Sequence, residues 1–202
     1  MRAYPHMILP LALLLHAKLV LVVGGGPIGT RKAMELVEAG AEVHLVTRRR
    51  SPELDTWLAT APPRVRVSDR AVVPEDVDDA WLVFAATEDP ETQRLVAERC
   101  LARRVFCVAV DDKANATAWG MGLLRRGPLV IAISSQSLAP ALTRVLREIL
   151  EELLPDEPTL EQVTALRARW KAEGLPLGAR FRDLVRRLAA RETERDEGAR
   201  NG

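Results

Sequence analysis

An aliphatic run that leads directly into a glycine-rich turn and a helical pattern is the feature that most constrains the fold of this chain. The run is Leu19–Val23, and the turn Gly24–Gly29 has the spacing Gly-x-Gly-x-x-Gly. In such a strand–turn–helix unit, Gly24 permits the tight turn, Gly26 lets a pyrophosphate approach the backbone, and Gly29 allows the helix to pack on the strand. The positive end of the helix dipole then faces the phosphates. We therefore predict a dinucleotide-binding turn, the alternative being a glycine turn with only a structural role.

A second strand follows this helix and completes a β-α-β unit. Gly40 is a C-cap signal, and Glu42–Thr47 has the pattern of a strand. Arg48, Arg49 and Arg50 come directly after it, where the adenosine ribose of a dinucleotide would lie. An acidic residue there favours NAD and an arginine favours NADP. The residues alone lean toward NADP, and the alternative is a solvated basic loop.

Further apolar runs extend this unit into a sheet. Strands are expected at 64–67, 81–87 and 105–110, with a helix at 91–103. Ligands of open α/β sheets bind beyond the carboxyl ends of the strands. The residues expected to line that crevice are Gly24, Thr47, Thr87 and Asp111.

The pattern changes after residue 128. A strand at 129–134, a polar turn and helices at 140–154, 159–171 and 179–190 are expected. This region is too small to fold alone, which suggests that it packs on a partner subunit. The predicted fold class is α/β: a Rossmann-like doubly wound parallel sheet followed by a small dimerisation region and a C-terminal helical region. The expected boundaries are 1–112 for the NAD-binding domain, 113–154 for the dimerisation and substrate region, 155–190 for the helical region and 191–202 for a disordered tail.

The composition of the chain bears on which kinds of partner it binds. The net charge of +1 on 202 residues gives no electrostatic reason to expect nucleic acid. Cys100 and Cys107 lack metal-ligand spacing to any other cysteine or histidine, so we expect buried thiols in a reducing cytoplasm and no metal site.

An apolar stretch at 7–15 raises the question of a secretory signal. Cleavage after it would leave the first strand at the extreme N-terminus, and Pro10 and Lys18 interrupt the run far short of a membrane span. An extended segment that leads into the first strand is the simpler interpretation, and no membrane association is expected.

The order of several motifs resembles the siroheme synthase N-terminal family, which comprises precorrin-2 dehydrogenases and sirohydrochlorin ferrochelatases, in its stand-alone form. The motifs lie at 9–11, 22–32, 39–41, 85–89, 110–111, 126–135, 140–142 and 146–148. Among them, the glycine turn followed by Arg31-Lys32 and the segment Arg126-Gly127-Pro128-Leu129 leading to Ile133-Ser134-Ser135 are the most specific. The resemblance implies an NAD-dependent oxidation of precorrin-2 to sirohydrochlorin for siroheme or cobalamin synthesis, in a homodimer. It also implies a possible second activity, sirohydrochlorin ferrochelatase.

The resemblance also implies roles for individual residues. Asp111 matches the family's essential aspartate, and a carboxylate there can take a proton from the ring as hydride leaves to the nicotinamide. The alternative for Asp111 is a turn aspartate after a strand. Ser135 matches a serine of the substrate crevice. The positions that match the dinucleotide contacts of the family are Pro27, Ile28, Arg48 and Arg49.

Two departures leave an alternative open. Val108 stands where the family usually has asparagine, and Gln136-Ser137 replaces two glycines. A divergent dinucleotide- or tetrapyrrole-binding protein without catalysis would also fit these residues. Because the family uses NAD without an acidic residue after the second strand, we expect NAD, with NADP as the alternative.

Overall fold

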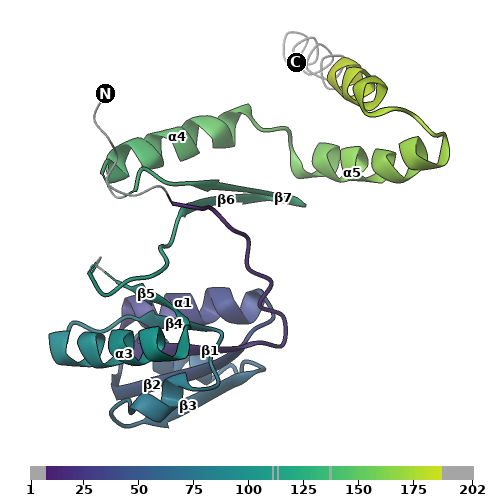
Figure 1. Ribbon diagram of the computed structural model, residues 1–202. Coiled ribbons are helices and arrows are strands. Elements are labelled where there is room, and N and C mark those ends of the chain that lie inside the picture. The colour runs from purple at the N-terminus through teal and green to yellow at the C-terminus, as the bar shows by residue number, and fades with distance from the viewer. Residues whose placement is uncertain (1–7, 111, 113, 137, 188–202) are drawn as a thin grey trace, which may run out of the picture. The chain divides into compact units, whose positions relative to one another are not determined.

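The chain forms two compact units in a computed structural model that describes residues 8–110, 112, 114–136 and 138–187. The units are Met1–Gly120 and Met121–Gly202 (Figure 1). No helix in the described part of the chain is long and apolar enough to cross a membrane.

A parallel sheet of five strands forms the first unit, with the strand order β3-β2-β1-β4-β5. The strands are β1 (Leu19–Gly25), β2 (Glu42–Arg50), β3 (Val65–Asp69), β4 (Leu82–Ala85) and β5 (Phe106–Ala109). The helices are α1 (Pro27–Glu38), α2 (Pro52–Leu58), the 3-10 helix η1 (Pro74–Val77) and α3 (Pro90–Arg103). The prediction of a Rossmann-like, doubly wound α/β fold is thereby confirmed.

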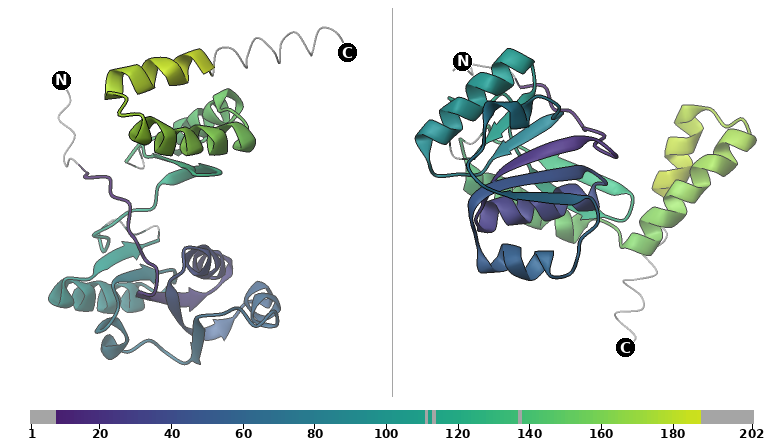
Figure 2. Two further views of the ribbon diagram at one scale, coloured as in Figure 1. Left: turned by 90° about the vertical axis from the view of Figure 1, so that its right-hand side faces the viewer. Right: turned by 90° about the horizontal axis from the view of Figure 1, so that it is seen from below.

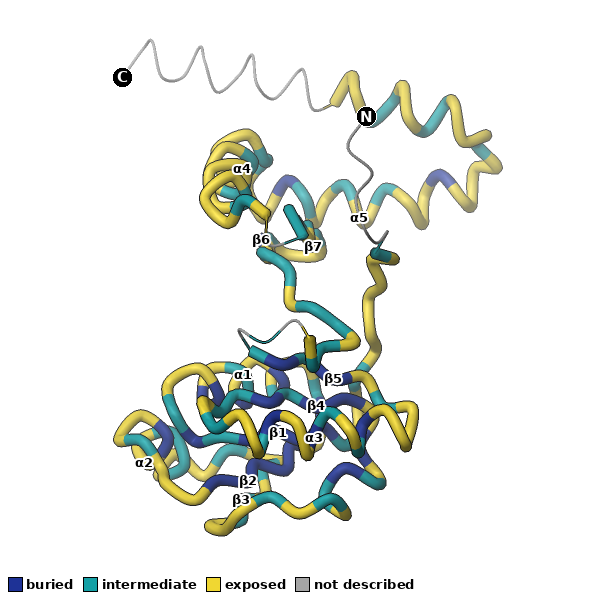
Figure 3. The backbone as a smooth tube through the Cα atoms, turned by 60° about the vertical axis from the view of Figure 1, so that its left-hand side comes forward, coloured by how far each residue is buried: buried dark blue, intermediate teal, exposed yellow. Residues whose placement is uncertain are grey.

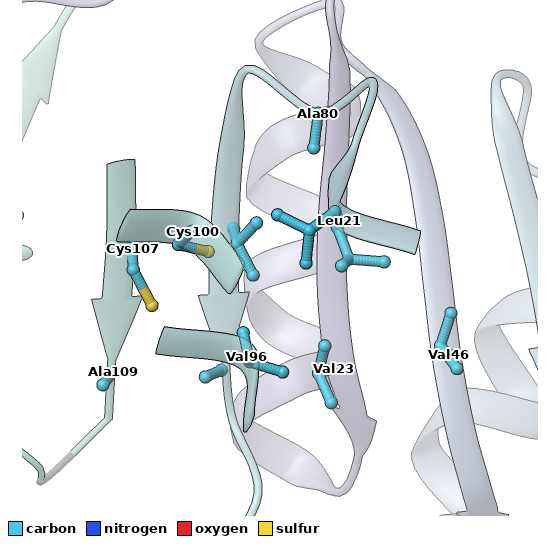
Figure 4. Close-up of a cluster of buried hydrophobic side chains, with 11 residues drawn as sticks. Leu21, Val23, Val46, Ala80, Val96, Cys100, Cys107 and Ala109 are labelled. Carbon is cyan, nitrogen blue, oxygen red and sulfur yellow. The ribbon is translucent and has the colours of Figure 1, made fainter. Parts of the chain in front are cut away.

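The two faces of the sheet carry separate apolar clusters, which explains why β1 reads as a continuous aliphatic run. Val20 and Val22 pack on one face, with side chains of α1 and α2. Leu21 and Val23 pack on the other, with Val96 of α3 (Figure 4). Figure 2 shows α1 and α2 on one side of the sheet and α3 on the other. A central parallel strand that is covered on both faces is apolar at successive positions and lacks the alternation of polar and apolar residues seen in half-exposed strands.

The end of β2 differs from the sequence-based expectation. The strand continues through Arg50 instead of ending at Thr47, so the three arginines are its last residues. Gly25 pairs with Arg50 across the sheet, and the Ser51 N–H donates to the Gly25 carbonyl at 2.9 Å. The Arg50 guanidinium also pairs with Asp69, the last residue of β3. These contacts with two neighbouring strands explain why a charged segment stays extended.

The short helix α2 was not expected from the sequence. Its local signal is a serine followed by proline: the Ser51 hydroxyl accepts the Leu54 N–H at 3.2 Å, and Pro52 occupies the first helical position. Leu54 is fully buried and anchors α2 to the sheet.

His44 is a buried residue of β2. Arg66 donates to its Nδ1 at 2.9 Å, so its Nε2–H donates to the Ser68 hydroxyl at 2.9 Å. Burial, followed by the charge of Arg66, lowers the pKa of His44 below its ordinary value, and the ring stays neutral.

The second unit consists of an antiparallel hairpin and helices. Its elements are β6 (Gly122–Arg126), β7 (Leu129–Ile133), α4 (Pro140–Leu153), α5 (Glu157–Ala172) and helical residues 177–187. The strand β6 was not expected from the sequence. Arg126 at its end donates to the carbonyls of Leu154 and Glu151, at 2.6 and 2.7 Å, and so joins the hairpin to the end of α4. The tail expected at 191–202 lies outside the described residues.

Candidate functional site

Two adjoining pockets lie at the carboxyl ends of the strands of the first unit. Their volumes are about 450 Å³ and about 420 Å³. Both are lined by Gly26, Ala86, Thr87 and Glu88, so they share a wall made by the glycine turn and the end of β4. This is the edge of an open α/β sheet at which dinucleotides bind. Volumes of this size are typical of small-molecule sites.

The glycine turn is held by two close backbone approaches. Gly24 has φ +114°, and a Cβ there would lie 2.2 Å from the Ala86 carbonyl oxygen. A Cβ on Gly29 would lie 2.0 Å from the Gly24 carbonyl oxygen, so only glycine lets α1 start this close to β1. Gly26 differs, because a Cβ there would meet nothing within 4 Å. The space beside Gly26 is therefore open to a ligand.

The start of α1 offers hydrogen-bond donors at this open space. Gly26 is the N-cap and Pro27 is the first helical residue. The first intrahelical bond runs from the Thr30 N–H to the Gly26 carbonyl at 2.9 Å, so the N–H groups of Ile28 and Gly29 precede it. No acidic residue occupies the first turn. The end of the helix can therefore bind an anionic group such as a diphosphate.

The larger pocket lies beside the end of β2 and is lined there by Thr47, Arg48 and Arg49. The Thr47 hydroxyl donates to the Arg49 carbonyl at 2.7 Å and accepts the Arg49 N–H at 3.2 Å. Thr47 therefore shapes the backbone that presents the two arginines. Gly25, which the sequence analysis did not single out, makes room for it, since a Cβ on Gly25 would lie 2.8 Å from the Thr47 hydroxyl.

Two charged residues of the larger pocket were also missed, and both have structural partners. Arg70, directly after β3, pairs with Asp76 through two hydrogen bonds of 2.6 and 2.7 Å. Asp89 is the N-cap of α3. The Thr92 hydroxyl, the Glu91 N–H and the positive charge of Arg48 lower the pKa of Asp89.

The smaller pocket is lined by Pro27 and Ile28 of α1 and by residues after β5. Gln93 of α3 donates to the Thr87 carbonyl at 2.5 Å and to the Val110 carbonyl at 3.3 Å. This side chain therefore joins the ends of β4 and β5, a role that no sequence pattern indicated.

The predicted catalytic residue, Asp111, lies outside the described residues, although its neighbours Val110 and Asp112 line the smaller pocket. The Asp112 carboxylate accepts the N–H groups of Ala114 and Asn115 at 3.1 and 3.3 Å, and the Asn115 side-chain amide as well. Asp112 thus stabilises a turn.

The predicted substrate residue, Ser135, belongs to the second unit. Its hydroxyl oxygen accepts the Ala139 N–H at 3.2 Å and the Thr143 hydroxyl at 3.1 Å, directly before and within α4. Within the described ranges, no group of three or more His, Cys, Asp or Glu side chains could hold a metal ion.

Comparison with known proteins gives this site a context. Residues 11–119 match the model of a family described as "Putative NAD(P)-binding". The chain is 36% identical over 184 residues to siroheme synthase 1 of Aeromonas hydrophila subsp. hydrophila. The aligned region covers 91% of this chain and 39% of that protein. Siroheme synthase 3 of the same organism is 39% identical over 188 residues. That aligned region covers 90% of this chain and 39% of the relative. The chain therefore spans about two fifths of the length of these relatives.

A solved structure, "SirC, precorrin-2 dehydrogenase", aligns with a TM-score of 0.71 at 22% identity, over 89% of this chain and 88% of that one. This likeness confirms the α/β fold. The sequence matches confirm the resemblance to siroheme synthases over most of the chain.

Proposed function

Because the chain belongs to the NAD(P)-binding family whose model its residues 11–119 match, we propose that it is a precorrin-2 dehydrogenase. In this proposal it oxidises precorrin-2 to sirohydrochlorin and passes hydride to a nicotinamide dinucleotide. The observation that carries the proposal is the pair of adjoining pockets around an open glycine turn. Similarity to siroheme synthases over about nine tenths of the chain supplies the substrate class.

The residues of the two pockets fit a dinucleotide. The open space beside Gly26 leaves room for a diphosphate, which the N–H groups of Ile28 and Gly29 would bind. The larger pocket would hold the adenosine, between the end of β2 and the start of α3. The smaller pocket would hold the nicotinamide, next to Val110 and Asp112.

The bound dinucleotide would accept a hydride from the substrate. The protein must then remove a proton from the same ring system, because dehydrogenation takes a hydride and a proton together. We assign that step to Asp111, which follows Val110 in the chain and matches the aspartate that the family uses. Ser135 is proposed to contact the substrate, with its hydroxyl oriented by the turn before α4.

Anaerobic incubation of the purified protein with precorrin-2 and either dinucleotide tests the proposal. We expect equal amounts of reduced dinucleotide and sirohydrochlorin to form. Both products can be monitored by their absorption spectra. Dinucleotide binding without oxidation would instead favour the non-catalytic binding protein. Addition of ferrous iron to the product tests ferrochelation, a separate proposal that rests on the resemblance alone.

We further propose that the protein acts as a homodimer in the cytoplasm. No residue of α4 is buried (Figure 3), and large apolar residues that recur at helical spacing are exposed along one face of it. These side chains are Leu142, Val145, Leu146, Ile149 and Leu153. Contiguous exposed apolar surface of this kind is typical of an interface between subunits. A reducing compartment would keep the buried Cys100 and Cys107 as free thiols.

Replacing Leu146 and Ile149 together by glutamate should convert the dimer into a monomer, because charges would then have to be buried in an apolar interface. Light scattering coupled to size-exclusion chromatography measures the mass. The matched control is Arg147→Glu, which adds negative charge to the same helix without removing an apolar side chain of the exposed face. A wild-type protein of monomeric mass would contradict the proposal.

A further inference from the structure

Arg48 and Arg49 differ from the other arginines around the larger pocket. Arg50 and Arg70 are each held by a carboxylate through paired hydrogen bonds. Arg48 and Arg49 line the pocket and are exposed. Within the part of the chain that the structure describes, neither guanidinium has a hydrogen bond or an ion pair within 4 Å, and Arg48 shares only a longer-range attraction with Asp89.

We infer that this site prefers a phosphorylated dinucleotide, NADP(H), whose 2′-phosphate is bound by Arg48 and Arg49. The inference rests on the proposed function, because it concerns the dinucleotide of the same site. It also departs from the NAD that the family resemblance implies. A guanidinium binds phosphate through paired, charge-assisted hydrogen bonds, and two such groups match a dianionic ligand.

The place of the two arginines in the fold supports this assignment. They lie at the carboxyl end of β2, where the adenosine ribose of a dinucleotide is bound in this class of fold. The Thr47 hydroxyl bonds to both the N–H and the carbonyl of Arg49, so the backbone there is held and not a loose loop. A held backbone loses less entropy at this segment when a ligand binds.

Among the described residues, none of those that line the β2 end of the pocket carries a carboxylate that would favour an unphosphorylated ribose. A carboxylate after β2 normally accepts hydrogen bonds from the ribose hydroxyls. The first carboxylate after β2 is Glu53 in α2, which lines neither pocket. Asp69, at the end of the neighbouring strand, is bound by Arg50.

Two carboxylates of the pocket, Glu88 and Asp89, could oppose a phosphate. They follow β4, which β1 separates from β2 in the sheet, although Asp89 is near enough to Arg48 for an electrostatic attraction. Asp89 is also occupied as the N-cap of α3, with bonds from the Glu91 N–H and the Thr92 hydroxyl. The charged groups that lie next to the end of β2 without a close partner are therefore the guanidinium groups of Arg48 and Arg49.

Calorimetric titration of the purified protein with NADPH, NADH, 2′,5′-ADP and 5′-ADP tests the inference. We expect NADPH to bind about tenfold or more tightly than NADH, and 2′,5′-ADP to exceed 5′-ADP by a similar ratio. The NADPH preference should shrink as salt is added, because the arginines are exposed.

The variant Arg48→Gln/Arg49→Gln should lower the NADPH-to-NADH preference to about one, whereas Arg94→Gln should keep it. Arg94 is a matched control because it is an exposed arginine that lines neither pocket. Equal or tighter binding of NADH by the wild type would overturn the inference and leave the proposed function standing. Binding of neither dinucleotide would overturn both. A preference that survives in the double variant would show that other residues bind the phosphate.

Discussion

Replacing Gly29 by alanine should destabilise the first unit by about 3 kcal/mol, a large part of the stability of a typical domain. The new Cβ would lie 2.0 Å from the Gly24 carbonyl oxygen, which is backbone and cannot rotate away. The helix α1 would have to move off β1, and its start would no longer face the pockets. Urea denaturation followed by circular dichroism measures the loss, and dinucleotide binding should disappear with it.

The matched control is Gly26→Ala, three residues earlier in the same glycine-rich turn. Gly26 has φ −77° and ψ −179°, a conformation that alanine adopts without strain, and its Cβ would meet no protein atom within 4 Å. We expect a free energy of unfolding within about 0.5 kcal/mol of the wild type. Dinucleotide affinity should still fall more than tenfold, because the methyl group would occupy the space proposed for the diphosphate. A Gly26→Ala protein that keeps its affinity would contradict that placement, and a Gly29→Ala protein of normal stability would contradict the packing argument.

The central part of the fold could be predicted because the residues that determine it are close together in the sequence. The strand β1 is buried on both faces and therefore reads as an uninterrupted aliphatic run. The glycine spacing marks where β1 ends and α1 begins. The extension of β2 to Arg50 could not be predicted in the same way, because it depends on pairing with Gly25 and on an ion pair with Asp69. Those partners are distant in sequence, and no periodicity reports them.

The candidate site shows the same division. The pocket edge at Gly24, Thr47 and Thr87 follows from a general rule about parallel sheets, and these residues do line the pockets. The packing of Gly25 on the Thr47 side chain depends on tertiary contact and left no separate pattern in the sequence. The contrast between free and paired arginines at the end of β2 likewise required coordinates. Arg48, Arg49 and Arg50 are indistinguishable as a sequence triplet.

Replacing Asp111 by asparagine should lower kcat for precorrin-2 oxidation by at least about 100-fold, since a general base typically contributes that much. The amide is similar in size to the carboxylate but cannot accept the proton. The Kd of the dinucleotide, measured by titration without substrate, should change little, because the contacts proposed for the diphosphate and adenosine lie at the start of α1, the end of β2 and the start of α3. A loss in kcat without a loss in dinucleotide binding separates chemistry from folding.

The control is Asp112→Asn, the adjacent carboxylate. Its oxygens accept N–H groups of Ala114 and Asn115, and an asparagine can still accept such bonds, so its effect on kcat should be far smaller. A pH profile adds a second readout: the wild-type rate should fall as Asp111 is protonated at low pH, and the residual rate of Asp111→Asn should lack that limb. Equal losses in the two variants would indicate a turn role for both aspartates, and full activity in Asp111→Asn would place the proton acceptor elsewhere.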